Sequence, residues 1–332
     1  MTQRKLISNE FASFLEKIQP IVIDLGARGD VDPDLLPYAW ACKLIGFEPE
    51  PIEAQRLIKQ GDSRWASFAI VPSAVGSKDG HMVLHLPLSE FGASLYAPNE
   101  KMIDMFGHEV YHRSIRTMDV ETVTLATVVH QYNLPQIDYL KIDIEGAELD
   151  ILRSMGESIS CCLAVKVEVS FLEQRQGQSY AWDVMEYMKQ NGYYLANIQN
   201  LFHWRRRPIP AHPYIARHTM PYSKGICSQC DLVFLKDITT IHDDEEAIRL
   251  SCMASLLGYF DYAVTVLRDR PSVAEQAIAK YSVDLEQEYQ KISRHVGRRA
   301  VLAKLKSNLR QSIPLIRSLL TGLPTAATTR PY

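Results

Sequence analysis

A short apolar segment that ends in an acid and two glycines constrains this chain more than any other feature. Residues 21–25 read IVIDL, and Gly26 and Gly29 follow in the next turn. A second apolar run ends in Glu48, nineteen residues after Gly29. A glycine-containing turn after one strand and an acid that ends the next are typical of a nucleotide site at the edge of a parallel sheet, where the acid accepts hydrogen bonds from the ribose hydroxyls. The sequence therefore predicts a parallel α/β sheet that binds a nucleotide.

Strand and helix signals alternate through the first two thirds of the chain. The expected strands are short, rich in valine and isoleucine, and mostly continuous in apolar character, which is typical of strands buried on both faces. They are residues 21–25, 44–48, 66–75, 137–143, 163–169, 193–198 and 232–235. The helices expected between them are residues 34–42, 52–59, 146–155 and 180–191. This alternation predicts a doubly wound sheet with right-handed crossovers.

Two parts of the chain depart from this alternation. Residues 76–80 indicate a tight turn and residues 81–86 alternate as a strand would, so we expect a hairpin there. Residues 87–119 show no clear period, and we expect an irregular insert over the ligand edge, a common place for a substrate lid.

After residue 236 the strand signals stop, and Pro314 is expected to break or kink the last helix. The helices expected in this region are residues 243–257, 259–268, 273–296 and 299–311.

The acid in the first turn bears on which nucleotide is bound. In the dinucleotide fingerprint the glycines surround a pyrophosphate at a helix N-terminus, and the carboxylate of Asp24 would repel that group. Asp30 also stands where the fingerprint has its third glycine. Two acids suit a ligand with a cationic end, and S-adenosylmethionine carries a sulfonium and an α-amino group there. The residues therefore favour S-adenosylmethionine over a dinucleotide, with the alternative that Asp24 only caps a turn.

Composition limits the class of protein. The chain of 332 residues is 46% apolar, which allows a sizeable core. No apolar run reaches the roughly 18 residues of a spanning helix, and the first residues lack the pattern of a secretory signal. Six cysteines in so long a chain do not make a disulfide framework. We therefore expect a cytoplasmic protein with reduced thiols.

Charge is distributed unevenly along the chain. Residues 291–332 contain nine lysines or arginines and no acid, which leaves 27 basic and 39 acidic residues for the rest. Such a tail favours an anionic partner or contact with the acidic body. We expect first a homo-oligomer formed through the C-terminal helices, and second a peripheral membrane contact. No aromatic residues are interleaved with the basic ones, so we expect no nucleic-acid partner.

Four motifs, in matching order and spacing, resemble those of the FkbM-type methyltransferases. They are residues 22–29 (VIDLGARG), 46–49 (GFEP), 73–76 (SAVG) and 139–152 (YLKIDIEGAELDIL), of which the last is the most specific. The resemblance implies a class I methyltransferase fold, which is a Rossmann-like, doubly wound sheet of seven strands, here with a C-terminal helical extension. It also implies S-adenosylmethionine as the donor and, usually, O-methylation of a hydroxyl on a sugar, glycan or related metabolite.

The resemblance assigns the donor site position by position. Asp24 and Gly26 match the donor-binding loop, and Glu48 matches the ribose acid. Residues 74–75 match the region beside adenine, and Asp143 matches the acid at the end of the fourth strand, beside the methyl group. The full set of expected cofactor-binding residues is Asp24, Gly26, Ala27, Arg28, Gly29, Glu48, Pro49, Ala74, Val75 and Asp143.

Methyl transfer to a hydroxyl requires a group that removes the hydroxyl proton. Asp143 and Glu145 are the leading candidates, because they follow an apolar strand and residues two apart on an extended chain point the same way. Glu145 could instead only begin the next helix and favour its dipole. His112 of the insert could act as a base near neutral pH or be a surface histidine without a role. Glu168 could pair with a lysine or join Asp143 around Mg²⁺, but no spacing is diagnostic, and we expect no metal.

The expected organisation is an N-terminal helix, a methyltransferase domain, a helical region and a disordered tail. These cover residues 1–17, 18–238, 239–320 and 321–332. Two other functions stay open at this point. One is a non-catalytic scaffold that presents the C-terminal helices to a partner, and the other is an NAD-dependent oxidoreductase.

Overall fold

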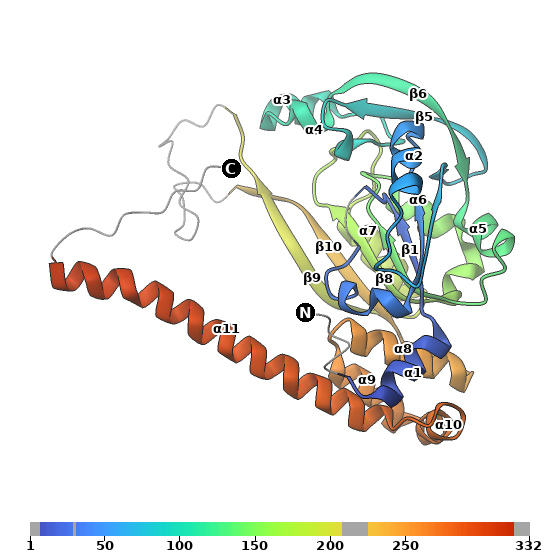
Figure 1. The fold of residues 1–332 in the computed structure, drawn as a ribbon. Coiled ribbons are helices and arrows are strands. Elements are labelled where there is room, and N and C mark those ends of the chain that lie inside the picture. The colour runs from blue at the N-terminus through green and yellow to red at the C-terminus, as the bar shows by residue number, and fades with distance from the viewer. Residues whose placement is uncertain (1–6, 29–30, 208–224, 322–332) are drawn as a thin grey trace.

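A computed structural model gives the fold and describes residues 7–28, 31–207 and 225–321 (Figure 1). Seven strands form the main sheet, in the order β3-β2-β1-β7-β8-β10-β9. They are β1 (Ile21–Leu25), β2 (Lys43–Phe47), β3 (Ser67–Val71), β7 (Ile137–Ile142), β8 (Cys162–Ser170), β9 (Tyr193–Trp204) and β10 (Ile226–Lys236). The first five run parallel, whereas β10 runs antiparallel to both β8 and β9. This sheet and the helices that follow it confirm the predicted α/β fold with a C-terminal helical extension.

Helices cover the sheet and continue beyond it. Those up to the last strand are α1 (Asn9–Ile18), α2 (Pro51–Gln60), α3 (Glu100–Phe106), α4 (Glu109–His112), α5 (Leu125–Gln131), α6 (Glu148–Ser154) and α7 (Ala181–Gln190). Those after it are α8 (Asp244–Leu256), α9 (Phe260–Asp269), α10 (Pro271–Tyr281) and α11 (Leu285–Thr321). Short 3₁₀ turns are η2 (Leu36–Ala41), η3 (Glu90–Gly92), η4 (Gly156–Cys161) and η5 (Ile238–Thr240). The helix expected at residues 34–42 is thus the 3₁₀ turn η2.

The central strands β1, β7 and β8 are buried on both faces, and successive residues of each strand point to opposite sides. Val22 and Tyr139 pack in a core that contains α1, η2 and α8–α10. Their neighbours Ile23 and Leu140 pack in a second core, built with α5, α6 and α7. The C-terminal helices therefore fill one of the two cores of the sheet, and without them one face of its central strands would be exposed to water.

A buried ion pair fixes α8 to the centre of the sheet. Nε and Nη2 of Arg249 donate to the two carboxylate oxygens of Asp138, at 2.9 and 2.6 Å. Nη1 of Arg249 donates to the carbonyl oxygen of Ile18 at 3.0 Å, and the backbone N–H of Ile21 donates to Asp138 at 2.6 Å. Because the Asp138 side chain is only 1% exposed, the protein rather than water satisfies its hydrogen-bonding capacity.

We expect Arg249→Ala to lower the free energy of unfolding by about 3–5 kcal/mol, because removing one partner leaves a buried charge uncompensated. Urea denaturation followed by circular dichroism measures this loss. Arg268→Ala is the matched control, since Arg268 pairs with Glu286 at 2.6 Å but its side chain is 65% exposed; its expected cost is about 1 kcal/mol or less. Equal losses of unfolding free energy in the two variants would contradict a stabilising role of the buried Arg249–Asp138 pair.

A second sheet of three strands, ordered β4-β6-β5, is formed by the region between β3 and α5. Its strands are β4 (Ala74–Val75), β5 (Gly80–Pro87) and β6 (Ser114–Val123). The predicted hairpin across residues 76–80 is wrong, because β4 pairs in parallel with β6, and β5 pairs antiparallel with β6. The strand expected over residues 66–75 divides at Pro72, which has no N–H to donate to a ladder.

Two features of the C-terminal region also differ from expectation. The helix expected over residues 273–296 is divided, because Ser282 has a left-handed backbone conformation (φ 58°) that ends α10. α11 then continues through Pro314 rather than breaking there. The described residues end at Thr321, so the expected disordered tail lies outside them. In the described part of the chain, no helix combines the length and the apolar character needed to cross a bilayer.

Candidate functional site

A cavity of about 340 Å³ lies between the carboxyl ends of β1, β2 and β7 and the segment that contains η3. The predicted donor residues that line it are Gly26, Arg28, Glu48, Pro49, Ala74, Val75 and Asp143. Asp24 and Ala27 line a neighbouring hollow instead, and Gly29 lies outside the described residues. Other residues in the wall include Phe47, Leu84, Glu90, Ser94, Lys141, Glu145, Lys166, Asn200 and Asp231.

The turn after β1 approaches the end of β7 so closely that only glycine fits. Gly26 has φ +93°, and a Cβ atom built on it would lie 2.1 Å from the carbonyl oxygen of Asp143. The backbone N–H of Asp143 also donates to the carbonyl oxygen of Leu25 at 3.1 Å. A side chain at position 26 would therefore separate the two strand ends that form the floor of the cavity.

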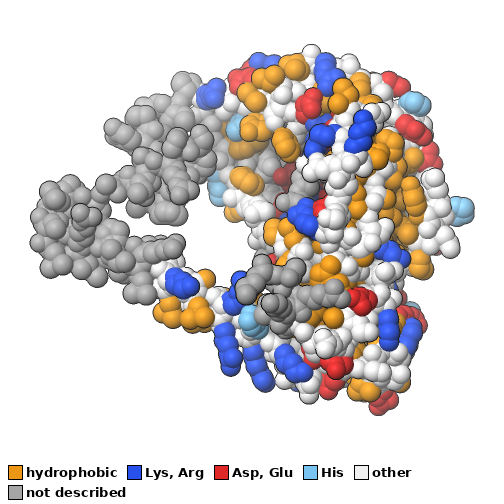
Figure 2. All heavy atoms as spheres, viewed as in Figure 1, with side chains coloured by type: hydrophobic (Ala, Val, Ile, Leu, Met, Phe, Trp, Pro, Cys, Tyr) orange, Lys and Arg blue, Asp and Glu red, His pale blue; other side chains and the backbone are white. Residues whose placement is uncertain are grey.

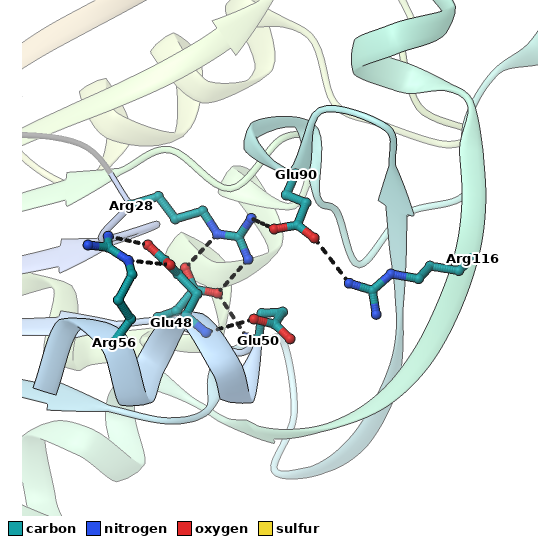
Figure 3. A network of polar contacts seen from close by, with 7 residues as sticks. Arg28, Glu48, Glu50, Arg56, Glu90 and Arg116 are labelled. Carbon is teal, nitrogen blue, oxygen red and sulfur yellow. Dashed lines mark hydrogen bonds and ion pairs between the residues drawn. The ribbon is translucent and has the colours of Figure 1, made fainter. Parts of the chain in front are cut away.

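The carboxylate of Glu48 is held in a fixed orientation at the end of β2 (Figure 3). Nε and Nη2 of Arg28 donate to its two oxygens at 3.0 and 3.2 Å. The backbone N–H of Glu50 donates to the same carboxylate at 2.8 Å. A carboxylate offers about four acceptor positions, so one remains for a ligand hydroxyl beside these three donors.

Arg28 also connects the donor turn to the insert. Its Nη1 donates to Glu90 of η3 at 3.2 Å, and Nη2 of Arg116 on β6 donates to the other Glu90 oxygen at 3.1 Å. Figure 3 shows the resulting chain of alternating charges from Glu48 to Arg116. The segment that closes one side of the cavity is thereby tied to the residues expected to hold the donor.

Asp24 is turned into the protein and is paired with a lysine. Its side chain is 1% exposed, and its carboxylate lies 3.2 Å from Nζ of Lys141. Burial raises the pKa of Asp24 to about 6, although Lys141 acts in the opposite direction. Nζ of Lys141 also lies 3.3 Å from Asp143, whose side chain is 40% exposed. Of these two acids, only Asp143 faces the cavity, and the sequence did not reveal Lys141 as the partner of Asp24.

Three carboxylates converge at the edge of the cavity, and two of them, Asp143 and Glu145, line it. Oxygens of Asp143, Glu145 and Glu168 lie within 4.8 Å of one another, close enough to share a divalent cation. Burial raises the pKa of Glu145 to about 7, and burial with the neighbouring acids raises that of Glu168 well above its usual range. The side-chain amide of Gln229 donates to Glu168 at 2.7 Å. Glu168 therefore has a neutral partner, rather than the lysine that we considered.

Arg175 holds Glu145 and the insert together. Its guanidinium donates to the carbonyl oxygens of His112 and Gly92, at 3.0 and 2.6 Å, and lies 3.4 Å from a carboxylate oxygen of Glu145. The Arg175 side chain is only 1% exposed, so these contacts form away from water. Sequence reasoning missed this residue, because it lies in a polar loop segment without a motif.

His112 lies in an aromatic cluster outside the cavity. Its ring is 5.2 Å from that of Trp204, and its Nδ1 has no hydrogen-bond partner among the described residues. Burial and the nearby Arg175 charge lower its pKa to about 3. This neutral, enclosed imidazole has no access to a reacting hydroxyl, so we do not retain His112 as a candidate base.

The lining residues fit the parts of S-adenosylmethionine. The glycine turn leaves backbone open to a ligand, the buried carboxylate of Glu48 would accept from a ribose hydroxyl, and Ala74 and Val75 would form the apolar wall beside the adenine. Asp143 adds a negative charge suited to the sulfonium and ammonium end. This fit depends on the turn that only a glycine at position 26 permits.

We expect Glu48→Ala to raise the dissociation constant of S-adenosylmethionine at least tenfold, because a hydrogen bond to a charged acceptor contributes about 1.5–3 kcal/mol. Isothermal titration calorimetry measures this change. Glu53→Ala is the control, since Glu53 is close in sequence and pairs with Arg56 but does not line the cavity. An unchanged dissociation constant in Glu48→Ala would contradict the prediction that Glu48 binds the ribose of the donor.

Comparison with known protein families gives a match over more than half of the chain. Residues 24–195 match the family described as the methyltransferase FkbM domain. The 2-O-methyltransferase NoeI of Sinorhizobium fredii (strain NBRC 101917 / NGR234) is 24% identical over 179 residues, which cover 52% of this chain and 72% of NoeI.

Two solved structures show a distant similarity to this chain. Streptococcus pneumoniae Sp1610, in complex with S-adenosyl-L-methionine, has a TM-score of 0.31 and 11% identity, with coverage of 88% of this chain and 100% of that one. The 23S rRNA methyltransferase ErmE has a TM-score of 0.31 and 8% identity, with coverage of 87% and 98%. TM-scores this low do not support a functional assignment, so the family assignment depends on the sequence match.

Proposed function

The chain belongs to the FkbM methyltransferase family, and on this premise we propose that it methylates a hydroxyl of a sugar, glycan or related metabolite. That it is a methyltransferase and uses S-adenosylmethionine follows from the family. The family assignment also removes the support for an NAD-dependent oxidoreductase and for a scaffold without a donor site.

The observation that carries the proposal is the Glu145 carboxylate in the cavity wall. A hydroxyl becomes a competent nucleophile when a base takes its proton, and a base is most effective when its pKa lies near the working pH. Burial gives Glu145 a pKa of about 7, and Arg175 fixes one of its oxygens. We therefore assign the base to Glu145 and contact with the donor to Asp143.

The protein's own part in the reaction is alignment and proton removal. Bound S-adenosylmethionine supplies an electrophilic methyl group. Glu48 and Asp143 would hold the two ends of the donor, which fixes the methyl group relative to the acceptor; alignment of this kind contributes on the order of 7–11 kcal/mol in ideal cases. Glu145 would hold the acceptor hydroxyl and receive its proton.

Polar groups on the far wall of the cavity support a hydroxyl-rich acceptor. The side-chain amide of Asn200 on β9 donates to Asp231 at 2.8 Å, and Asp231 lies 3.1 Å from Nζ of Lys166. All three residues line the cavity, so amide, carboxylate and ammonium groups are available to sugar hydroxyls. The name of the relative NoeI, a 2-O-methyltransferase, agrees with transfer to oxygen.

We expect Glu145→Gln to lower kcat by about 10²–10⁴-fold, the usual contribution of a positioned base, with an unchanged dissociation constant for S-adenosylmethionine. Asp143→Asn should weaken donor binding as well as turnover. Single-turnover assays with radiolabelled donor and a panel of activated sugars and lipid-linked glycans provide the rates, and calorimetry provides the affinities. A Glu145→Gln variant that turns over normally would overturn the assignment of the base.

The pH dependence follows from the raised pKa of Glu145. Glu145 accepts a proton only when it is ionised, so kcat should rise with pH through about 7 and then level off. Removing the Arg175 charge, which lowers the pKa of Glu145, should move this rise to higher pH. Arg175→Lys, which keeps a cation, is the control that should move it less. A rising limb that persists unchanged in Glu145→Gln would belong to another group.

A further inference from the structure

From its geometry and charge, we propose that α11 docks this protein on an anionic lipid surface. The first turns of α11 are part of the core, where Leu285, Tyr289 and Ile292 are buried. The helix then leaves the body and extends away from it (Figure 1). This inference is independent of the proposed acceptor.

The projecting part of α11 exposes apolar side chains to water. Every residue from Val296 to Leu305 is exposed. Val301, Leu302 and Leu305 are 60%, 57% and 52% exposed, respectively. The sequence continues this spacing with leucine or isoleucine at positions 309, 313, 316 and 320. A helix in water is stabilised mainly by packing of its apolar face. We therefore expect another apolar surface to bury these side chains.

Basic residues flank the apolar stripe on both sides. At about 100° per residue, Val301, Leu302 and Leu305 fall within one third of the helix circumference. Lys304 then lies about 60° beyond one edge of the stripe, and Lys306 about 40° beyond the other. Figure 2 shows basic side chains beside apolar ones on the described part of α11. Lysines in these positions can extend to lipid phosphates while their stems cover apolar surface.

The charge of this segment selects the lipid surface over other occupants. Nine basic residues and no acid follow position 290, so two copies of this segment would repel each other. A nucleic acid would match the charge but not the leucine stripe, and Tyr332 is the only aromatic residue of the segment available for stacking on bases. An anionic bilayer matches both properties, because its phosphates attract the lysines and its acyl region takes up the leucines.

Docking through α11 leaves the cavity free. Among the residues that the structure describes, none beyond Asp231 lines the cavity, whereas α11 begins against α9 and α10. Variants of the projecting helix should therefore keep their affinity for S-adenosylmethionine in solution.

The test is flotation of the full-length protein with vesicles of phosphatidylcholine alone or with 30% phosphatidylglycerol. We expect binding only to the anionic vesicles, weakened at least tenfold by Leu302→Glu and at least tenfold by the double variant Lys304→Glu/Lys306→Glu. Ile278→Glu on α10 is the matched control, because Ile278 is 54% exposed, and it should bind as the unmodified protein does.

Several results would overturn the proposal. Absence of anionic vesicle binding, equal binding to both vesicle types, or equal loss in Leu302→Glu and Ile278→Glu would do so. Light scattering tests whether the stripe instead forms a dimer interface. A dimer that dissociates in Leu302→Glu would assign the stripe to self-association. Displacement of the protein from anionic vesicles by single-stranded RNA at equal charge concentration would assign it to nucleic acid. Calorimetry with S-adenosylmethionine confirms that each variant is folded.

Discussion

The site depends on the contact between two backbone segments at the centre of the sheet. Gly26 brings the turn after β1 against the carbonyl group of Asp143 at the end of β7. This contact places the residues expected to bind the donor beside the carboxylates that could remove a proton. It is a contact of main chain with main chain, so its geometry is independent of side-chain rotamers.

Buried charges around this contact are balanced by opposite charges rather than by water. Lys141 lies between Asp24 and Asp143, and Lys166 lies 3.4 Å from Asp32 and 3.1 Å from Asp231. Each lysine thus offsets two acids, which lowers the cost of burying so many carboxylates in one place. In the described part of the chain neither lysine pairs with Glu145 or Glu168, and burial raises the pKa of both acids, as it also raises that of Asp24.

Much of the fold could be predicted because its central strands are locally encoded. The apolar run of residues 21–25 is β1 without an error at either end. The small sheet could not be predicted, because β4 has two residues and its parallel partner in β6 is distant in the chain. The same limit applies to the site. The motifs placed Glu48 and Asp143 in the cavity wall, but they could not show that Asp24 turns towards Lys141. Arg175 acts through long-range contacts that leave no local pattern.

The two-sided core has a consequence for how such proteins diversify. Alternate side chains of β1 and β7 belong to different cores, and the sequence matched by the family, residues 24–195, ends before α8–α10 begin. Val22 and Tyr139 must therefore fit helices outside the matched segment. A recombination event could join this segment to the C-terminal helices of a divergent homologue. The face of the sheet and the helices that cover it would then not be complementary in shape. We therefore expect the segment to be inherited together with the helices behind it.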